Sequence, residues 1–384
     1  MVVASADLSN SDKTDGFLKH THAFRKGDFS GQFLQMGVSE LTMACIMNGM
    51  ALHGGIIPVC GTFFVFSDYM KPAVRLAALM QLHVIYVWTH DSFRVGEDGP
   101  THQPVEHEAQ LRLLEHLHNH KGKRAMVVLR PADAEETIYA WKIALEENRP
   151  TALILSRQGI VTLPAASGDR RKEARRIVKG GYIVCDCEGQ PDVVMLASGS
   201  EVATLVEGAA KLAKAGIKTR VVSVPSEGLF RDQKADYREH VLPKGVRRFG
   251  LTSGLPVTLQ GLVGDNGVVH GLSEFGYSAP YKVLDRKLGY TGENVCRLVK
   301  KMLNVVRMEI KTIGFASDHA GFALKNTLLN YMVAKGYVCH DFGTYSEESC
   351  DYPDYAHLLA RAVEGAQVDR GIALCGTGNG IAMA

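Results

Sequence analysis

Short apolar runs alternate with amphipathic segments along the whole chain, which is the pattern of strands alternating with helices. The expected strands of the first third are residues 1–6, 83–88, 125–129 and 151–155. Between them, residues 40–53 form a nearly continuous apolar stretch closed by Gly54-Gly55, which predicts a helix with a glycine stop. This order of elements predicts α/β layers with mostly parallel sheets.

The same alternation recurs twice more, so the chain is expected to contain successive three-layer α/β domains. In the second region residues 193–197 predict a strand, and residues 201–214 predict a helix after the turn Ser198-Gly199-Ser200. The third region has an expected strand at 310–316, a helix at 320–335 and a strand at 337–342. The expected domains are residues 1–158, 180–303 and 308–384.

Residues 159–179 interrupt the pattern with Pro164, Gly168 and a basic cluster at 170–176. Such a run can bind polyanions, but it is more often a solvated linker, and we interpret it as one. Likewise, the Ser198-Gly199-Ser200 turn could bind an anion at a helix amino end, although an ordinary strand-to-helix turn is the simpler interpretation. The second domain has no constellation of acid, base and nucleophile, so its expected role is packing.

Composition narrows the class of protein without changing this architecture. The 384 residues are 46% apolar and 22% charged, which favours a globular protein. Lys plus Arg number 43 against 41 Asp plus Glu, so the chain has no large net positive charge to attract nucleic acid or a membrane. No apolar run reaches the roughly 18 residues that span a bilayer. The eight cysteines are scattered rather than set at the spacing of a disulfide framework, so we expect a cytoplasmic protein. They form no CxxC pair or zinc-ligand spacing, so we expect no metal ligands in this chain.

The polar stretch at residues 89–104 carries the most information about chemistry. It follows the expected strand 83–88, and the carboxyl ends of parallel strands are where such sheets place ligands. The stretch reads Thr-His-Asp-Ser at 89–92 and Gly-Glu-Asp-Gly-Pro-Thr-His-Gln-Pro at 96–104, and it resembles the transketolase family. Further co-linear matches lie at residues 6–11, 37–40, 61–66, 150–158 and 275–280, so the resemblance covers roughly residues 1–303.

The resemblance implies a thiamine site on the pyrimidine side. In the family, the residue that corresponds to Glu40 bonds a ring nitrogen of the aminopyrimidine and favours the imino tautomer that activates the thiazolium ring, which requires a carboxyl group in an apolar setting. Phe63, Phe66 and Tyr69, at i, i+3 and i+6, are expected to share one helical face and form the flat wall against the pyrimidine. Asp7 matches a polar contact to the cofactor.

The same resemblance assigns substrate contacts. His90 and His102 match residues that bond sugar hydroxyls and the carbonyl at which charge develops, and Asp98 matches a hydroxyl contact beside the scissile bond. Ser11 and Arg157 match the contacts to the sugar phosphate, for which the planar guanidinium is well suited.

The sequence also departs from the family. Transketolases have an amino-terminal domain whose Gly-Asp-Gly motif and downstream Asn hold magnesium and the diphosphate, and this sequence contains no such motif. We therefore expect the chain to supply only the pyrimidine-side half of a site for thiamine diphosphate and magnesium. It would act as a homodimer or with a separate amino-terminal subunit. The alternatives are a non-catalytic dimerising subunit that completes a site on another polypeptide, or an enzyme similar to deoxyxylulose-phosphate synthase.

From residue 308 onward the sequence resembles type B ribose-5-phosphate isomerases. The matching segments are Ser317–Gly321, Gly343–Tyr345, Asp351–Pro353 and Cys375–Gly380. The resemblance implies that Cys375 is the base for proton transfer between neighbouring carbons.

It also implies that the amides around Gly376, Gly378 and Gly380 bind the oxyanion. Asp318, His319 and Tyr352 correspond to contacts with the sugar ring and its hydroxyls. The family's ring-opening histidine and phosphate-binding arginines would follow residue 384, so this domain is expected to be truncated.

Overall fold

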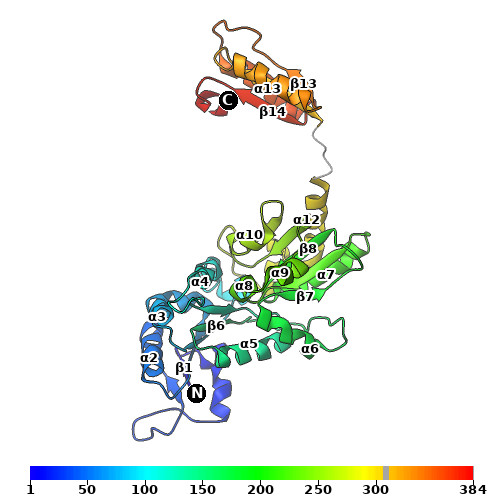
Figure 1. Ribbon diagram of the computed structural model, residues 1–384. Helices are drawn as coiled ribbons and strands as arrows, with labels where there is room; N and C mark the ends of the chain where they lie inside the picture. Colours follow the sequence, from blue (N-terminus) through cyan, green and yellow to red (C-terminus); the bar gives the residue numbers. More distant parts are fainter. Residues whose placement is uncertain (306–310, 384) are drawn as a thin grey trace. The chain divides into compact units, whose positions relative to one another are not determined.

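The computed structural model describes residues 1–305 and 311–383, and the chain divides into two compact units, Met1–Met302 and Leu303–Ala384 (Figure 1). Both have the expected α/β architecture with mostly parallel sheets. The expected domain start at Met308, and the first residue of the strand expected at 310–316, lie outside the described residues.

The first sheet of unit 1 is wholly parallel, with the order β2-β1-β3-β4-β6-β5. Its strands are β1 (Val2–Ser5), β2 (Phe33–Gln35), β3 (Pro58–Phe63), β4 (Ile85–Thr89), β5 (Val127–Leu129) and β6 (Thr151–Ile154). The accompanying helices are α1 (Ser9–Asp12), α2 (Glu40–His53), α3 (Ser67–Met80), α4 (His107–His116) and α5 (Ala134–Glu146), with the 3-10 helices η1 (Thr14–Lys19), η2 (Phe64–Phe66) and η3 (Phe93–Asp98).

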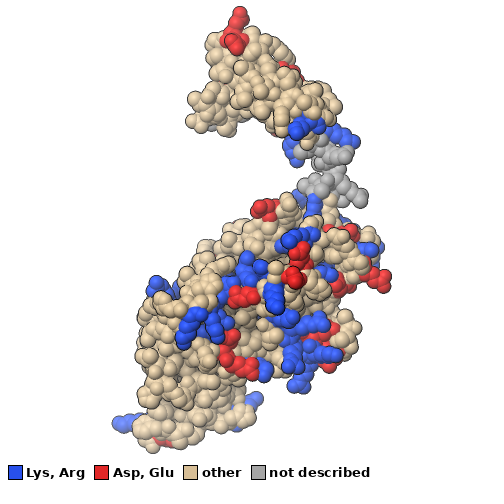
Figure 2. Space-filling view, viewed as in Figure 1, with Lys and Arg blue, Asp and Glu red and all other residues tan. Residues whose placement is uncertain are grey.

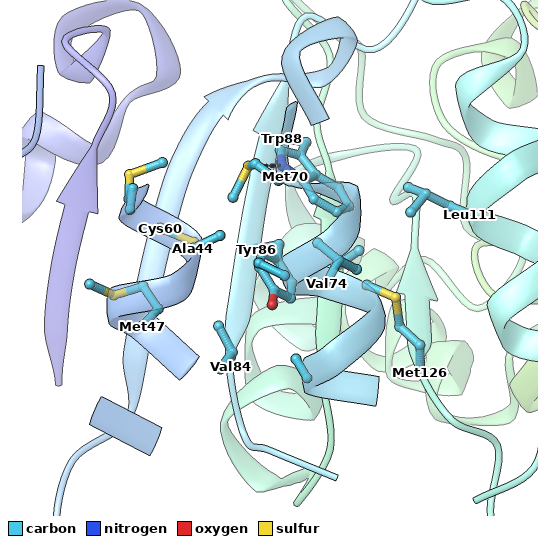
Figure 3. Packing of buried hydrophobic residues seen from close by; sticks show 14 of the residues in the cluster. Ala44, Met47, Cys60, Met70, Val74, Val84, Tyr86, Trp88, Leu111 and Met126 are labelled. Carbon is cyan, nitrogen blue, oxygen red and sulfur yellow. Dashed lines mark hydrogen bonds between the residues drawn. The ribbon is translucent and has the colours of Figure 1, made fainter. Parts of the chain in front are cut away.

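Alternate residues of these strands enter two separate cores, because successive strand side chains point to opposite faces. On one face, Tyr86 and Trp88 of β4 pack against α2, α3 and α4 (Figure 3). On the other, Ile85 and Val87 pack with α5. Helix α2 begins and ends where the sequence predicted, with Gly54 at φ 86° after its last residue.

The second sheet of unit 1 has the order β11-β10-β8-β9-β7, and only β7 runs antiparallel to its neighbour. Its strands are β7 (Tyr182–Cys185), β8 (Val193–Ala197), β9 (Thr219–Ser223), β10 (Arg247–Leu251) and β11 (Val268–His270). Its helices are α7 (Glu201–Ala213), α8 (Glu227–Arg231), α9 (Ala235–Val241), α10 (Val257–Val263), α11 (Tyr281–Leu288) and α12 (Gly292–Val305).

The segment expected to be a solvated linker is partly folded and partly buried. It contains α6 (Arg170–Ala174) and the 3-10 helix η4 (Arg175–Lys179). Arg171, Lys172, Arg175 and Arg176 are exposed as expected, but the expectation is wrong for Arg170. This side chain is buried, and its guanidinium nitrogens lie 2.6 Å from Asp133 and 3.2 Å from Glu136 of α5. One arginine of a basic run can be buried when acidic partners from a distant segment neutralise its charge, and the local sequence does not show those partners.

Unit 2 contains a parallel sheet of three strands in the order β13-β12-β14. The strands are β12 (Thr312–Ser317), β13 (Val338–Asp341) and β14 (Arg370–Leu374), and the helices are α13 (Phe322–Ala334), α14 (Tyr352–Glu364) and α15 (Asn379–Met383). Its core cluster is small and consists of Ala316, Leu359, Ala362 and Val368.

Basic and acidic side chains are intermixed on the face of unit 1 shown in Figure 2. Within the described part of the chain, no helix is long and apolar enough to cross a bilayer.

Candidate active site

A cavity of about 610 Å³ lies at the carboxyl ends of β1 and β3, and β4 is the next strand of the sheet. The registers Ser5↔Gly61 and Phe63↔Thr89 bring the segments that follow these strands to one edge of the sheet. The residues that line the cavity are Ala6, Asp7, Leu8, Val38, Glu40, Phe63, Phe66, Tyr69 and His102. Six of these, Asp7, Glu40, Phe63, Phe66, Tyr69 and His102, were singled out from four separate sequence motifs.

Glu40 is the first residue of α2 and lines this cavity from a nearly buried position, with 7% of the residue exposed. Met43, Ala44 and Met47 of the same helix are fully buried. The apolar setting expected for Glu40 is therefore present.

The aromatic wall exists, but the prediction that it lies on one helical face is wrong. Phe63 ends strand β3, Phe66 ends the 3-10 helix η2, and Tyr69 is in the first turn of α3. The rings nevertheless stack in sequence, with centroid separations of 5.9 Å for Phe63–Phe66 and 6.2 Å for Phe66–Tyr69. A strand-to-helix junction thus arranges three rings that the i, i+3, i+6 spacing had suggested for a helix.

His90 and His102 border this wall. The His90 ring stacks on Phe63 with a centroid separation of 3.6 Å, and His102 lies edge-on to Phe66 at 5.5 Å. Burial, together with the nearby charge of Arg157, lowers the pKa of His90 to about 4, so its imidazole is neutral at pH 7. A neutral ring offers one nitrogen as donor and the other as acceptor.

Asp7 and His90 have left-handed backbone conformations, with φ values of 64° and 61°. Residues other than glycine rarely adopt this region because the Cβ atom crowds the backbone, and the strain is concentrated at functional sites. Each of these residues follows closely after a strand end of the first sheet. Backbone strain therefore marks two of the residues that the sequence had selected on other grounds.

Four predicted contacts do not line the cavity: His90, which is buried, and Ser11, Asp98 and Arg157, which are exposed. Asp98 and Arg157 nevertheless lie close enough for their charges to act on the pKa of His90, in opposite directions. They therefore lie near His90. Ser11 lies on α1, beside Asp12.

Asp12, which the sequence interpretation missed, fixes the segment that carries Asp7 and Ser11. Its buried carboxylate accepts hydrogen bonds from Ser5 Oγ at 2.7 Å and from Thr14 Oγ1 at 2.6 Å. Gly61 of β3 permits this arrangement, because a Cβ atom there would lie 2.6 Å from the Thr14 methyl group. A buried acid two residues before a hydroxyl side chain is a weak sequence signal, which explains why it was not selected.

A second feature missed from the sequence is a buried ionic cluster beneath the loop of residues 89–98. Arg130, immediately after β5, contacts Asp91 of the loop and Glu201 of α7, and Arg94 contacts Glu201 as well. Arg130 follows a strand at its carboxyl end, which is the same signal that identified His90. The rule could therefore have found Arg130, although not its partner 71 positions later.

The Phe275–Pro280 segment also contacts the polar loop. Gln103 Nε2 donates hydrogen bonds to the carbonyl oxygens of Gly96 and Tyr277, at 3.1 and 2.9 Å, and Ser278 Oγ donates to the Glu97 carbonyl oxygen at 2.6 Å. The second sheet region thus does more than cover a surface, because its side chains and backbone restrain the loop that carries His90 and His102.

Among the residues that the structure describes, one group has the composition of a metal site. Asp68, Glu106 and His107 lie together, with His107 Nε2 3.2 Å from Asp68 Oδ1. Lys71 Nζ already lies 2.7 Å from the same Asp68 oxygen. A lysine ammonium group in that position supplies the positive charge that a cation would bring, so we interpret the group as an ion-pair cluster.

In unit 2, the register Ser317↔Leu374 places the segments beginning at Asp318 and Cys375 side by side. Hydrogen bonds from the backbone N–H groups of Ile381, Thr377 and Gly378 lower the pKa of the Cys375 thiol. The Gly378 amide nitrogen lies 3.2 Å from Cys375 Sγ. At least this amide is directed at the sulfur, whereas the sequence had suggested that the glycine-loop amides bind an oxyanion.

The other predicted residues of unit 2 surround the same loop. Asp318 is nearly buried, and its carboxylate accepts from the Gly321 amide at 2.9 Å. His319 Nδ1 lies 3.1 Å from the Cys350 carbonyl oxygen. The ring of Tyr352 packs against Gly380, where an added Cβ atom would lie 2.7 Å from the ring. Gly376 and Gly378 are exposed in the same loop.

Comparison with known families identifies three matching regions of the chain. Residues 1–161 match the transketolase pyrimidine-binding domain, residues 180–291 the transketolase-like C-terminal domain, and residues 313–384 the ribose/galactose isomerase family. The transketolase of Halalkalibacterium halodurans is 46% identical over 301 residues, which cover 78% of this chain and 43% of that protein. The chain thus spans less than half the length of this relative.

Solved structures show the same relationship. Transketolase from Leishmania mexicana superposes with a TM-score of 0.70 and 38% identity, covering 79% of this chain and 42% of that one. A structure described as a split gene transketolase, inactive beta4 tetramer, superposes with a TM-score of 0.61 and 25% identity, covering 79% of this chain and 92% of the other. This chain therefore carries the pyrimidine-binding and C-terminal domains of the transketolase family, followed by a domain of the ribose/galactose isomerase family.

Proposed function

We propose that unit 1 provides the pyrimidine-side half of a transketolase active site, which transfers a two-carbon ketol unit between phosphosugars in the cytoplasm. The observation that carries the proposal is the cavity that joins Glu40, the three stacked rings and His102. Transketolase relatives imply thiamine diphosphate and a divalent metal, and magnesium is the metal we propose.

The residues present fit the pyrimidine part of that cofactor. A flat heteroaromatic ring requires an apolar face and one directional polar partner. Phe63, Phe66 and Tyr69 supply the face, and the nearly buried Glu40 carboxyl supplies the partner. When bound, thiamine diphosphate supplies the nucleophilic carbon that accepts the ketol unit. Glu40 holds a proton at the pyrimidine ring nitrogen, and the rings orient the pyrimidine and exclude water.

On the substrate side, the neutral His90 and the neighbouring His102 bind the sugar oxygens. His90 can donate from one nitrogen while its other nitrogen accepts, and its low pKa keeps this state across the physiological range. Asp98 contacts a hydroxyl group, and the exposed Arg157 and Ser11 bind the phosphate at the solvent side of the cavity. A planar guanidinium at such a position suits phosphate oxygens.

We infer that another polypeptide completes the site by providing the groups that hold the diphosphate and the metal. The support is the relative described as a split gene transketolase, of which this chain covers 92%. That relative is described as inactive in the form of a beta4 tetramer. This chain is then expected to pair with a separate amino-terminal subunit, or with a second copy of itself. A non-catalytic dimerising role remains the alternative function, and an activity like that of deoxyxylulose-phosphate synthase is the third.

Complementation tests the proposal. The purified chain, with thiamine diphosphate and magnesium, should show no ketol transfer, and adding a separately expressed amino-terminal transketolase domain should create turnover with phosphosugars. Turnover by the chain alone would contradict the split site. Association with the added domain without any turnover would favour the non-catalytic subunit.

Unit 2 supports a second proposal, a ribose-5-phosphate isomerase-type activity with Cys375 as base. The supporting observation is that backbone N–H groups stabilise the Cys375 thiolate while Asp318 and His319 follow the neighbouring strand end. We propose that this activity is incomplete in residues 311–383. Extending the chain by the following residues of a type B isomerase should produce isomerisation of ribose 5-phosphate that Cys375→Ser abolishes, whereas an extended chain without activity would contradict the assignment.

A further inference from the structure

Two arginines from different parts of the pyrimidine-binding domain converge on one carboxylate of the C-terminal domain. Glu201 is the first residue of α7 and is fully buried. Its Oε1 lies 2.5 Å from Arg94 Nη1, and its Oε2 lies 2.5 Å from Arg130 Nη1. Each carboxylate oxygen of Glu201 therefore forms an ion pair with an arginine of the pyrimidine-binding domain.

Each arginine ties Glu201 to the loop of residues 89–98. Arg130 Nε and Nη2 donate to Asp91 Oδ2 at 3.0 and 2.7 Å, and Asp91 directly follows His90. Arg94 belongs to the loop itself, and its Nε donates to Asp285 Oδ1 of α11 at 2.7 Å. The loop is thus attached to the C-terminal domain on both sides of residues 92–93, between the two predicted substrate contacts His90 and Asp98.

The C-terminal domain is shaped to receive Arg130. The side chain is 1% exposed, and its remaining N–H groups donate to the Ser198 carbonyl oxygen at 3.0 Å and to Ser253 Oγ at 2.9 Å. Gly199 has φ +61°, and a Cβ atom there would lie 2.7 Å from Arg130 Cζ. Glycine at this position permits both the turn and the close approach of the guanidinium. The turn Ser198-Gly199-Ser200 therefore binds the side chain of Arg130.

Such a network fixes geometry more than it adds stability. Desolvation of buried ions offsets much of their attraction, so their clearest contribution is to hold groups in one arrangement. His90 needs this restraint, because its left-handed backbone at φ 61° persists only when the surroundings enforce it. Its ring stacks on Phe63.

We propose that Glu201 is a positioning residue of the active site: through Arg130 and Arg94 it holds the loop that carries His90 in the conformation that places the imidazole over Phe63. The role of His90 in catalysis rests on the proposed transketolase function. The statement that Glu201 holds the loop in place does not depend on that function. The C-terminal domain thereby gains a role in organising the substrate side of the site.

The test replaces Glu201 in the full chain with glutamine, which keeps the shape and removes the charge. We expect amide hydrogen exchange in residues 89–98 to become about tenfold faster or more, because the local opening energy of the loop falls. The His90 pKa, followed by its NMR ring signals, should rise from about 4 toward its ordinary value as the ring gains water.

Glu136→Gln is the matched control. Glu136 is also fully buried, contacts Arg170 at 3.2 Å and accepts from Tyr182 of the second sheet, but it does not contact the loop. It should change global stability without selective exchange in residues 89–98 or a shift of the His90 signals. Equal exchange and unchanged His90 signals in the two variants would overturn the proposal.

Asp285→Asn provides a second route if Glu201→Gln fails to fold. Asp285 Oδ1 contacts Arg94 Nε, whereas Asp91 is held by Arg130. This change should therefore loosen residues 93–98 while Asp91 stays in place. Unchanged exchange at residues 93–98 would overturn the role of the Arg94 branch. These measurements need no turnover, so a failed complementation would remove the transketolase proposal and leave this result standing.

Discussion

His90 and Cys375 are both proposed to act on sugars, and the protein tunes them by opposite physical means. His90 is nearly buried, and loss of hydration lowers its pKa because the charged imidazolium form is disfavoured. Cys375 is partly exposed, and amide N–H groups lower its pKa because they stabilise the charged thiolate. The first kind of tuning requires a large surrounding structure, whereas the second is achieved by one short loop.

The cores of the two units differ in the same sense. Two clusters of buried side chains lie on the two faces of the first sheet of unit 1, whereas the cluster of unit 2 is small and centred on Leu359 of α14. In α13 of unit 2 the buried side chain is Lys325, which contacts Asp341 at 2.6 Å, rather than an apolar residue. Unit 2 therefore stabilises the Cys375 thiolate through a short loop, although its apolar core is small.

The strongest test of the unit 1 site is Glu40→Gln in the complemented enzyme. The amide cannot hold an acidic proton at the pyrimidine nitrogen, so exchange of the cofactor's thiazolium proton should slow by about 10²- to 10⁴-fold. Thermal unfolding should change little. Glu146→Gln, an exposed carboxylate paired with Lys142 on α5, is the control. Near-normal proton exchange in Glu40→Gln would remove Glu40 from this role.

Core truncation in each unit tests the difference in support. Leu359→Ala in unit 2 and Met47→Ala in unit 1 should each cost about 2–5 kcal/mol, because each leaves a cavity in a core. Unit 2 has fewer apolar contacts to lose, so Leu359→Ala should abolish amide protection throughout residues 311–383. Met47→Ala should leave the six-stranded sheet protected.

Equal residual protection in the two variants would show that the cores are comparably robust. The wild-type chain provides the reference, and limited proteolysis should remove unit 2 before unit 1.

Arg157→Ala should weaken phosphorylated acceptors selectively in the complemented enzyme. Losing a charged hydrogen-bonded contact costs roughly 1.5–3 kcal/mol, which corresponds to about 10- to 150-fold in affinity. Acceptors without a phosphate should change little, and Arg171→Ala, an exposed arginine of α6, is the control. Equal losses for both kinds of acceptor would make Arg157 structural.

Titration sharpens the comparison between His90 and Cys375. The NMR signals of His90 should show a pKa near 4, so the contribution of its neutral state to stability is complete above about pH 6.5 and is lost as the pH falls toward 4. In alkylation experiments Cys375 should react at lower pH than an ordinary thiol, while buried Cys60, whose pKa is raised by burial, should not react in the folded chain. A His90 pKa near 6.5 would contradict its burial.

Local patterns in the sequence were sufficient for many of the elements, and they selected six of the residues that line the cavity. Helix α2 matched the expected limits at Glu40 and His53 because an apolar run with a glycine stop is encoded within that segment. The strands β4, β6 and β8 were found for the same reason. The short strand β2 and the strand β3, whose residues 58–63 run into an aromatic segment, carried no comparable signal of their own and were not predicted.

Tertiary structure decided how these pieces form sites. Phe63 and Tyr69 both line the cavity, but a strand end and a helix start, rather than one helix, bring their rings into one wall. Arg170 lies in a basic run and is nevertheless buried, because Asp133 and Glu136 reach it from α5. Glu201 and Arg130 meet across two domains from positions 71 residues apart. Sequence periodicity reports what neighbours in the chain share, whereas burial and charge pairing depend on which distant segments the fold brings into contact.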